Sequence, residues 1–192
     1  MGGNVTRHVR RLRDLVLGLA ILALALLVIA KLENEQALRF SGLFSVIDGD
    51  TLIADGERLR IEGIDAPELS QVCKAADGAP YACGEEARRA LIALVSGRGF
   101  ECTGTRRDRY GRLLVVCKRG LDDLGEILVR TGSVVADGRY LASETEARRA
   151  GEGIWRGDFE RPADWRRQRQ IDEAELTGWV EALPPRWLTH WF

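Results

Sequence analysis

The chain has 192 residues, which is enough for one ordinary domain with appended segments. Its formal net charge is −1 at pH 7, but the first 31 residues hold five Lys or Arg and one Asp, so the remainder carries −5. This acidic balance argues against binding of a polyanion through the bulk electrostatic field alone, and phosphate chemistry would have to depend on locally placed arginines.

The N-terminal segment is apolar and has basic flanks. Residues 15–30 form a run of sixteen apolar residues, preceded by four arginines and followed by Lys31. Because basic flanks stay in the cytoplasm, residues 15–31 are predicted to be a transmembrane anchor or a signal peptide, and a buried core helix is the third interpretation. Residues 1–14 are then cytoplasmic and the rest is periplasmic or extracellular, or secreted if residues 1–30 are cleaved.

One folded domain is expected between two polar segments. Residues 32–41 are expected to be a linker, residues 42–165 the domain, and residues 166–192 a C-terminal tail that contains tryptophan. The domain begins with short apolar alternations separated by Asp-Gly pairs at 48–49 and 55–56. An Asp-Gly pair in this setting is a strong hairpin signal, so three antiparallel strands are predicted.

The third of these strands changes phase at Gly63. Apolar residues stand at odd positions before it and at an even position after it. Because successive strand side chains point to opposite faces, this pattern predicts a bulge at the glycine. The bulge would place Arg60, Glu62 and Asp65 on one side. The alternative is that Arg60 and Glu62 form an ordinary surface ion pair.

The remaining elements complete a small barrel. A helix is predicted over 84–96, a second hairpin from 100–107 and 113–118, a short helix over 121–131, and a further helix from a capping box at Ser143. The fold class is therefore α+β, a five-stranded Greek-key OB-type β-barrel with three helices, preceded by one N-terminal hydrophobic helix.

The four cysteines lie in the part expected to be exported, where disulfides persist: Cys73, Cys83, Cys102 and Cys117. Cys102 and Cys117 flank a turn almost symmetrically, so a cross-strand bridge is predicted, which leaves Cys73 to pair with Cys83. Buried free thiols are the alternative. The spacing contains no C-x-x-C pair, which argues against a zinc site.

Three motifs carry charged residues at the hairpins. They are VIDGDTL at 46–52, RIEGIDAPE at 60–68 and DRYGR at 108–112. Each motif alone is weak, but the three in this order, with a helix between the second and third, resemble the staphylococcal nuclease (thermonuclease) family over about residues 43–157. The resemblance implies an OB barrel that hydrolyses phosphodiester bonds of DNA or RNA with one Ca²⁺.

The resemblance also implies roles for individual residues. Asp50 and Asp65 would be carboxylate ligands of Ca²⁺, and Ala66, where the best-known member has threonine, would offer its backbone carbonyl. Glu68 would be the general base. The guanidinium groups of Arg60 and Arg112 would clamp the phosphate. Arg109 and Tyr110 would contact the substrate.

The implied chemistry is physically reasonable. A hard cation prefers oxygen ligands, and forked guanidinium groups match the charge that grows on a phosphate in the transition state. His8 and His190 are the only histidines, and they lie in the terminal segments, which excludes histidine-based mechanisms. Arg109 as an ordinary turn charge and Tyr110 as hairpin packing remain open alternatives.

One departure from the family concerns base stacking. The best-known member stacks a tyrosine-containing loop on the nucleotide, whereas the corresponding stretch here is shorter and has only Tyr140. More than one function is therefore retained. The leading hypothesis is an extracytoplasmic Ca²⁺-dependent nuclease, and the alternatives are a catalytically silent OB-fold nucleic-acid-binding module and an envelope protein that only binds calcium. No protein partner is implied.

Overall fold

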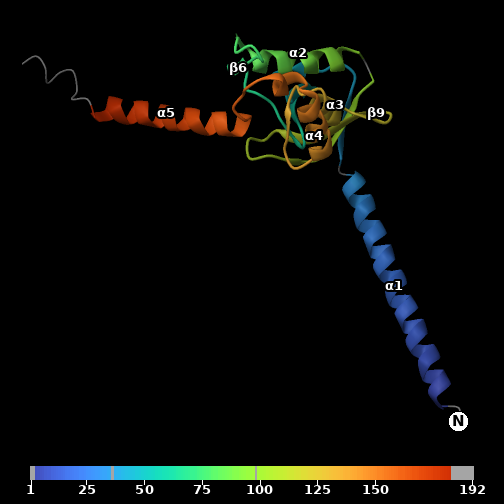
Figure 1. Cartoon of the computed structure of the whole chain (residues 1–192). Coiled ribbons are helices and arrows are strands. Elements are labelled where there is room, and N and C mark those ends of the chain that lie inside the picture. Colours follow the sequence, from blue (N-terminus) through green and yellow to red (C-terminus); the bar gives the residue numbers. More distant parts are fainter. Residues whose placement is uncertain (1–2, 36, 98, 183–192) are drawn as a thin grey trace, which may run out of the picture. The chain divides into compact units, whose positions relative to one another are not determined.

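The computed structural model describes residues 3–35, 37–97 and 99–182 and divides into two compact units, Met1–Arg39 and Phe40–Phe192 (Figure 1). The first unit contains helix α1 (Gly3–Glu35). Among the described residues, α1 is the one helix long and apolar enough to cross a membrane, over Arg11–Ile29, and protein buries none of that window. It covers the apolar run found in the sequence, and a membrane span and a signal sequence meet the same criterion.

The second unit is built on a curled sheet. Its strands are β1 (Leu38–Ser41), β2 (Ser45–Val46), β3 (Thr51–Ala54), β4 (Glu57–Ile61), β8 (Glu101–Arg107), β9 (Leu113–Arg119) and β10 (Asp122–Asp123). The order is β1-β8-β9-β4-β3-β2, with β10 paired to β9. Strands β2, β3 and β4 form the predicted antiparallel meander, β4 pairs in parallel with β9, and β8 and β9 form the second hairpin. The predicted α+β class with an OB-type sheet is confirmed.

Two short sheets lie outside this path. Strand β5 (Ile64–Asp65) pairs with β11 (Val135–Ala136), and β6 (Cys73–Lys74) pairs with β7 (Pro80–Tyr81). The first of them matters for function, because it fixes the backbone of Asp65 to the segment that follows the third helix.

The three predicted helices of the domain are present as α2 (Cys83–Ser96), α3 (Leu124–Arg130) and α4 (Leu141–Ala150). The predicted capping box of the last one is wrong, because α4 begins after Tyr140, which has a positive φ of 60°, and the Ser143 hydroxyl donates to Glu126 instead. A 3-10 turn, η1 (Gly153–Arg156), and the long helix α5 (Pro162–Ala182) follow.

Two of the expected segment boundaries differ from the structure. Residues 38–41, assigned to the linker, form β1 beside β8, and Phe40 on this strand is buried in the core. The boundary between residues 165 and 166 falls inside α5, so the tail begins as part of a helix that was not predicted from the sequence. Residues 183–192, the rest of the tail, lie outside the described residues.

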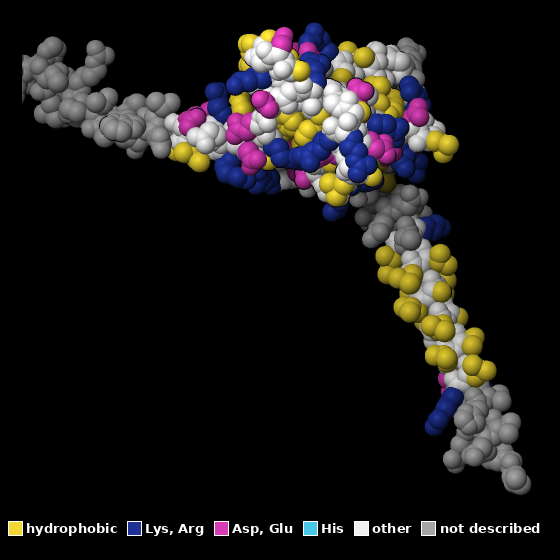
Figure 2. All heavy atoms as spheres, in the orientation of Figure 1, with side chains coloured by type: hydrophobic (Ala, Val, Ile, Leu, Met, Phe, Trp, Pro, Cys, Tyr) yellow, Lys and Arg dark blue, Asp and Glu magenta, His cyan; other side chains and the backbone are white. Residues whose placement is uncertain are grey.

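The core is apolar and lies between the sheet and helices α2 and α3. Its largest fully buried side chains include Phe100, Leu52, Leu59, Leu91 and Leu124. Burial of this kind of surface is the main term that stabilises such a domain. On the visible face of the domain, basic and acidic side chains are interspersed, whereas apolar side chains cover the middle of α1 (Figure 2).

Both disulfides are present. Cys102 on β8 stands opposite Cys117 on β9 and is bonded to it, and both lie in the core. Cys73 on β6 is bonded to Cys83 at the start of α2 and closes the loop that follows the RIEGIDAPE motif. All four cysteines are thus paired as predicted. The bridges therefore restrain both sides of the region where the motifs meet.

Candidate active site

Gly63 separates β4 from β5 and sets the direction of Asp65. Its φ is +82°, and a Cβ atom there would lie 2.6 Å from the side chain of Arg139. A glycine tolerates both the conformation and the close contact. Ile61 before it and Ile64 after it are both buried, so the predicted change of phase is confirmed.

The first hairpin places Asp50 directly before β3. The backbone N–H of Asp50 donates to Oδ1 of Asp48 at 3.0 Å, which makes Asp48 a turn-forming residue. The carboxylate of Asp50 is buried and accepts hydrogen bonds from the hydroxyl of Thr51 at 2.8 Å and from the backbone N–H of Ala66 at 3.3 Å.

Burial disfavours the ionised form of the Asp50 carboxylate. Burial raises the pKa of Asp50 to about 6, and the negative charge of Asp48 adds to this, although the charge of Arg60 acts in the opposite direction. A further cation near Asp50 would therefore stabilise its ionised form.

Arg60 joins the two aspartates of the site. Its Nη1 donates to Oδ2 of Asp50 at 2.6 Å, and its Nη2 donates to Oδ1 of Asp65 at 3.1 Å. Burial acts to lower the pKa of Arg60, but the two carboxylates outweigh it and hold that pKa above its ordinary value. Two buried carboxylates thus converge on one cationic group.

Glu68 lies in the loop after β5 and is bound by an arginine from α5. Nη1 of Arg166 donates to Oε1 of Glu68 at 2.8 Å. Nη2 of the same side chain donates to both Oδ1 and Oδ2 of Asp65 at 3.0 Å. Burial acts to lower the pKa of Arg166, but the hydrogen bonds and charges of these two carboxylates raise it above its ordinary value.

The second hairpin presents the DRYGR motif beside this cluster. Asp108 accepts hydrogen bonds from the backbone N–H groups of Tyr110 and Arg112 at 2.8 and 3.0 Å, and Nε of Arg112 donates to Oδ2 of Asp108 at 2.8 Å. The guanidinium groups of Arg109 and Arg112 lie 4.8 and 5.5 Å from the centre of the Tyr110 ring. Nη1 of Arg112 also reaches the hydroxyl of Thr51 at 3.4 Å.

These residues line one cavity of about 680 Å³. Its lining consists of five arginines, two carboxylates and one tyrosine: Arg58, Arg60, Arg109, Arg112, Arg166, Glu68, Asp108 and Tyr110. All the sequence-predicted catalytic and substrate-binding residues are in this set. The predicted metal-binding residues Asp50, Asp65 and Ala66 are buried and do not line the cavity, but Arg60, which does, donates to both aspartates. The cavity is locally basic although residues 32–192 carry a formal net charge of −5, so it suits a phosphate group.

The family model described as "Staphylococcal nuclease homologue" matches residues 58–157, just over half of the chain. The chain belongs to the staphylococcal nuclease homologue family. The matched residues include β4, both sides of the second hairpin and the helices up to η1, and therefore most of the cavity. Arg166 lies beyond them.

Several relatives of this family member are similar over most of its folded domain. A succinoglycan biosynthesis protein, ExoI, of Rhizobium meliloti is 40% identical, over 62% of this chain and 66% of its own length. An uncharacterized endonuclease of Escherichia coli is 31% identical, over 65% of this chain and 82% of its own length. A micrococcal nuclease of Shigella flexneri is 30% identical, over 64% of this chain and 77% of its own length. The chain spans about two thirds of the Rhizobium relative and about one third (32%) of a rice staphylococcal-like nuclease, CAN2.

The donor set of this family member fits a hard cation. No group of three or more His, Cys, Asp or Glu side chains among the described residues is arranged to hold a metal ion. Two carboxylates, Asp50 and Asp65, nevertheless converge on the guanidinium of Arg60, and the raised pKa of Asp50 favours an added cation. Oxygen ligands suit Ca²⁺, whose remaining ligands are commonly carbonyl oxygens and waters.

Glu62 differs from what the bulge suggested. It joins neither the site nor Arg60, because it pairs with Arg106 at 2.7 Å and Arg139 at 3.5 Å. Tyr140, which stands in the stretch that is shorter than in the best-known family member, does not line the cavity, and its hydroxyl donates to Asp123 at 2.8 Å.

Three residues that line the cavity were not predicted from the sequence: Arg58, Asp108 and Arg166. A period of two from Arg60 along β4 is a signal that indicates Arg58, and Asp108 is the first residue of the DRYGR motif. Arg166 has no such signal.

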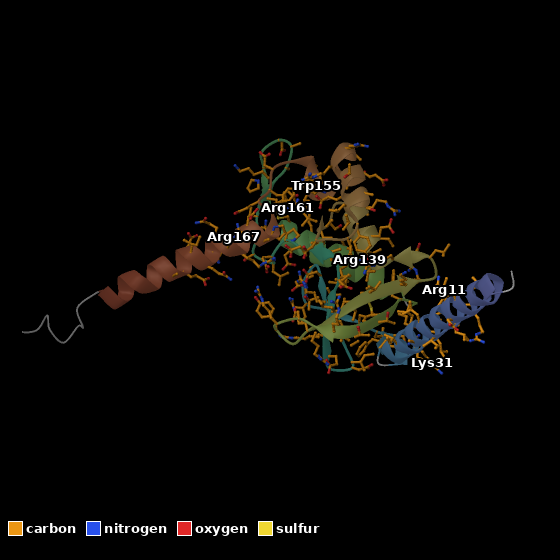
Figure 3. The ribbon with its side chains drawn as sticks, turned by 90° about the horizontal axis from the view of Figure 1, so that it is seen from below. Arg11, Lys31, Arg139, Trp155, Arg161 and Arg167 are labelled. Carbon is orange, nitrogen blue, oxygen red and sulfur yellow. A yellow bond between two sulfur atoms is a disulfide. The ribbon has the colours of Figure 1, made fainter. Side chains whose placement is uncertain are left out.

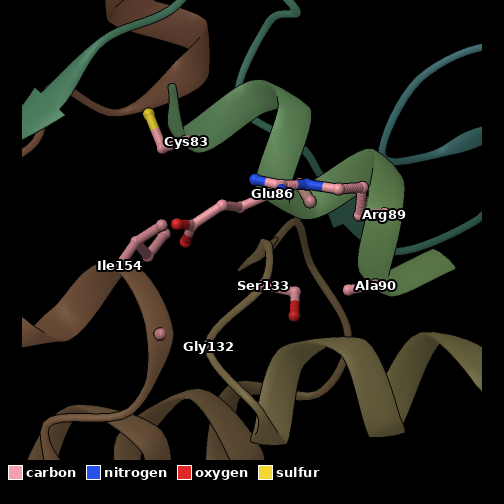
Figure 4. A pocket seen from close by; sticks show the side chains of 9 residues that line it. Cys83, Glu86, Arg89, Ala90, Gly132, Ser133 and Ile154 are labelled. Atoms are coloured by element: carbon pink, nitrogen blue, oxygen red, sulfur yellow. The ribbon is translucent and has the colours of Figure 1, made fainter. Parts of the chain in front are cut away.

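A second cavity, of about 460 Å³, lies between α2, the turn after α3, and η1 (Figure 4). Its lining includes Cys83, Glu86, Arg89, Ser133 and Ile154. Cys83 is bonded in a disulfide, and Glu86 accepts a hydrogen bond from Arg156 at 2.9 Å. None of the three motifs contributes a residue to it, so the first cavity is the candidate active site.

Proposed function

We propose that this protein is a Ca²⁺-dependent nuclease that hydrolyses phosphodiester bonds of DNA or RNA. The observation that carries the proposal is the cavity in which five arginines surround Glu68 next to a buried pair of aspartates. A protein that only binds nucleic acid gains nothing from carboxylates that repel phosphate. Membership of the staphylococcal nuclease homologue family and relatives named as nucleases support the same function.

In this proposal the carboxylates of Asp50 and Asp65 and the backbone carbonyl of Ala66 would hold the calcium ion. When bound, the ion would neutralise charge on a phosphoryl oxygen. The best-known family member has threonine where this chain has Ala66, but the difference does not affect this ligand, since the backbone carbonyl supplies it.

The remaining chemistry belongs to side chains that line the cavity. Glu68 accepts a proton from the water that attacks phosphorus, the new P–O bond forms, and the bond to the leaving oxygen breaks. Arg60 and Arg112 donate to the phosphate oxygens as negative charge grows on them. Arg109 and Tyr110 contact the adjoining nucleotide or its phosphate.

We further propose that α1 anchors the protein in a membrane, with the N-terminus in the cytoplasm and the nuclease domain outside it. Arginines precede the apolar window, which fits a cytoplasmic N-terminus. The two disulfides, Cys73–Cys83 and Cys102–Cys117, suit an oxidising compartment. If residues 1–30 are cleaved, the same domain is secreted.

The test is a cleavage assay on the full chain in a mild detergent. Plasmid DNA, single-stranded DNA and RNA are each incubated with the protein in calcium and in excess chelator. We expect cleavage in calcium and none in chelator. Cleavage in chelator would contradict the calcium requirement. Binding without cleavage in every condition would instead support the silent OB-fold module, and Glu68→Gln is the control for contaminating nuclease.

A further inference from the structure

The start of α5 is tied to the loop that carries Glu68. The buried side chain of Gln71 donates from Nε2 to the backbone carbonyl of Glu160 at 2.7 Å and accepts at Oε1 from the backbone N–H of Glu68 at 3.2 Å. Arg161, directly before α5, is held separately to α4, because its Nη1 donates to Oε1 of Glu144 at 3.3 Å. Figure 3 shows Arg161 and Arg167 at this start of α5. The position of Arg166, one turn further on, is therefore fixed by the fold.

Arg166 contacts both carboxylate oxygens of Asp65, one of which Arg60 also contacts. Oδ1 of Asp65 accepts from both Arg60 and Arg166, and Oδ2 accepts from Arg166. Both acceptor sites of Oδ1 are thus used, so a metal ion can bind Oδ1 only if one guanidinium moves, and a metal ion at Oδ2 would lie beside the guanidinium of Arg166. The side chain of Arg166 is 38% exposed and that of Arg60 17%, so Arg166 is the one that can leave with the smaller rearrangement.

The charges lead to the same conclusion. Asp50, Asp65 and Glu68 carry three negative charges, and Arg60 and Arg166 carry two positive ones within 3.1 Å of them. A calcium ion added to this set would meet Arg166 as a like charge across Asp65. Its binding and the Arg166–Asp65 contact therefore oppose each other.

We propose that Arg166 is a positioning residue of the active site that holds Asp65 and Glu68, and that a calcium ion bound at Asp65 competes with it for this carboxylate. This inference depends on the calcium-dependent function proposed above. The same guanidinium donates to Oε1 of Glu68 through Nη1. Its displacement from Asp65 would therefore also move a positive charge relative to the proposed base.

The first test measures calcium affinity without nucleic acid, by titration calorimetry on the full chain in detergent. Arg166→Gln removes the competing charge, and we expect the Kd for calcium to fall roughly tenfold. An effect of this size is expected because Arg166 is partly exposed, and charge interactions contribute little free energy at exposed sites and much more at buried ones. Arg166→Lys keeps the charge and should stay within about threefold of wild type. Arg167→Gln, at the neighbouring exposed position paired with Asp164, is the matched control and should not change the Kd.

The second test uses the wild-type protein and so does not depend on the folding of a variant. Phenylglyoxal modifies accessible arginines, and peptide mass spectrometry gives the rate at each site. We expect calcium to increase the rate at Arg166 and to leave Arg167, the internal control, unchanged.

The outcomes separate the two proposals. Absence of calcium binding by the wild-type protein would overturn the calcium-dependent function and this inference with it. Calcium binding by the wild type, combined with an unchanged or higher Kd in a folded Arg166→Gln or with an unchanged modification rate at Arg166, would overturn the inference alone.

Discussion

Replacement of Asp50 by asparagine should change how the stability of the metal-free protein depends on pH. Burial raises the pKa of Asp50 from its ordinary value of 3.8 to about 6. The folded state therefore holds the proton more tightly than the unfolded chain does. The resulting stabilisation is complete below pH 3.8 and is lost as the pH rises through 6. An asparagine has no such titration.

The size of the effect follows from the two pKa values. Each pKa unit corresponds to about 1.4 kcal/mol, so a difference of about two units corresponds to about 3 kcal/mol. The substitution also has costs that do not depend on pH, because the new amide would keep only part of the contacts that the carboxylate makes with Thr51 and Arg60. The difference between two pH values removes those costs.

The assay is urea unfolding of wild type and Asp50→Asn in excess chelator at about pH 4 and pH 8. The difference in free energy of unfolding between the two proteins should change by roughly 2 kcal/mol or more between these pH values. The variant should gain this much relative to wild type at the higher pH. Asp77→Asn, at an exposed position, corrects for the loss of one charge. A pH-independent difference between wild type and Asp50→Asn would refute the reasoning. Calcium should then stabilise wild type at pH 8 and leave Asp50→Asn unchanged, by ligand linkage.

Three further predictions concern the same domain. Glu68→Gln should keep calcium binding and lower turnover by about two to four orders of magnitude, and a single-turnover rate within threefold of wild type would remove Glu68 as the base. Arg112→Lys should lower kcat severely because lysine lacks the fork, which steady-state kinetics would detect; full activity would exclude the phosphate clamp. Non-reducing peptide mapping should find Cys73 with Cys83 and Cys102 with Cys117. Loss of either bridge should cost about 3 kcal/mol for loops of 10 and 15 residues, whereas unchanged unfolding after reduction would contradict this.

Local sequence patterns were sufficient to predict the parts of the site that depend on the hairpin turns and on Gly63. The Asp-Gly turns fix where β3 and β4 begin, and Gly63 fixes the phase of β5, so the juxtaposition of Arg60 with Asp65 follows from spacing along the chain. The second hairpin brings Arg112 beside them through the parallel pairing of β4 with β9. That pairing is tertiary and was not predicted from the sequence, since the family resemblance implied only an OB barrel.

Other parts depend on contacts between distant residues and had no sequence signal. Arg166 binds Glu68 and Asp65, which lie 98 and 101 positions earlier in the chain. The residues around it form a polar helix that carries no motif. Strand β1 is short, and its neighbour in the sheet is β8, a partner that no local pattern in residues 38–41 identifies. Glu62 was misplaced because its partners, Arg106 and Arg139, come from other segments.

The arrangement explains how an acidic chain can present a site for phosphate. Field strength at a site depends on the nearest charges, since salt screens those more than about 8–10 Å away. Five arginines line the cavity, but Arg60 and Arg166 are engaged by buried carboxylates and Arg112 by Asp108. A cation that replaces Arg166 at Asp65 would release positive charge into the same cavity. The affinity of the site for phosphate should therefore rise with calcium occupancy, and by reciprocal linkage bound phosphate should strengthen calcium binding.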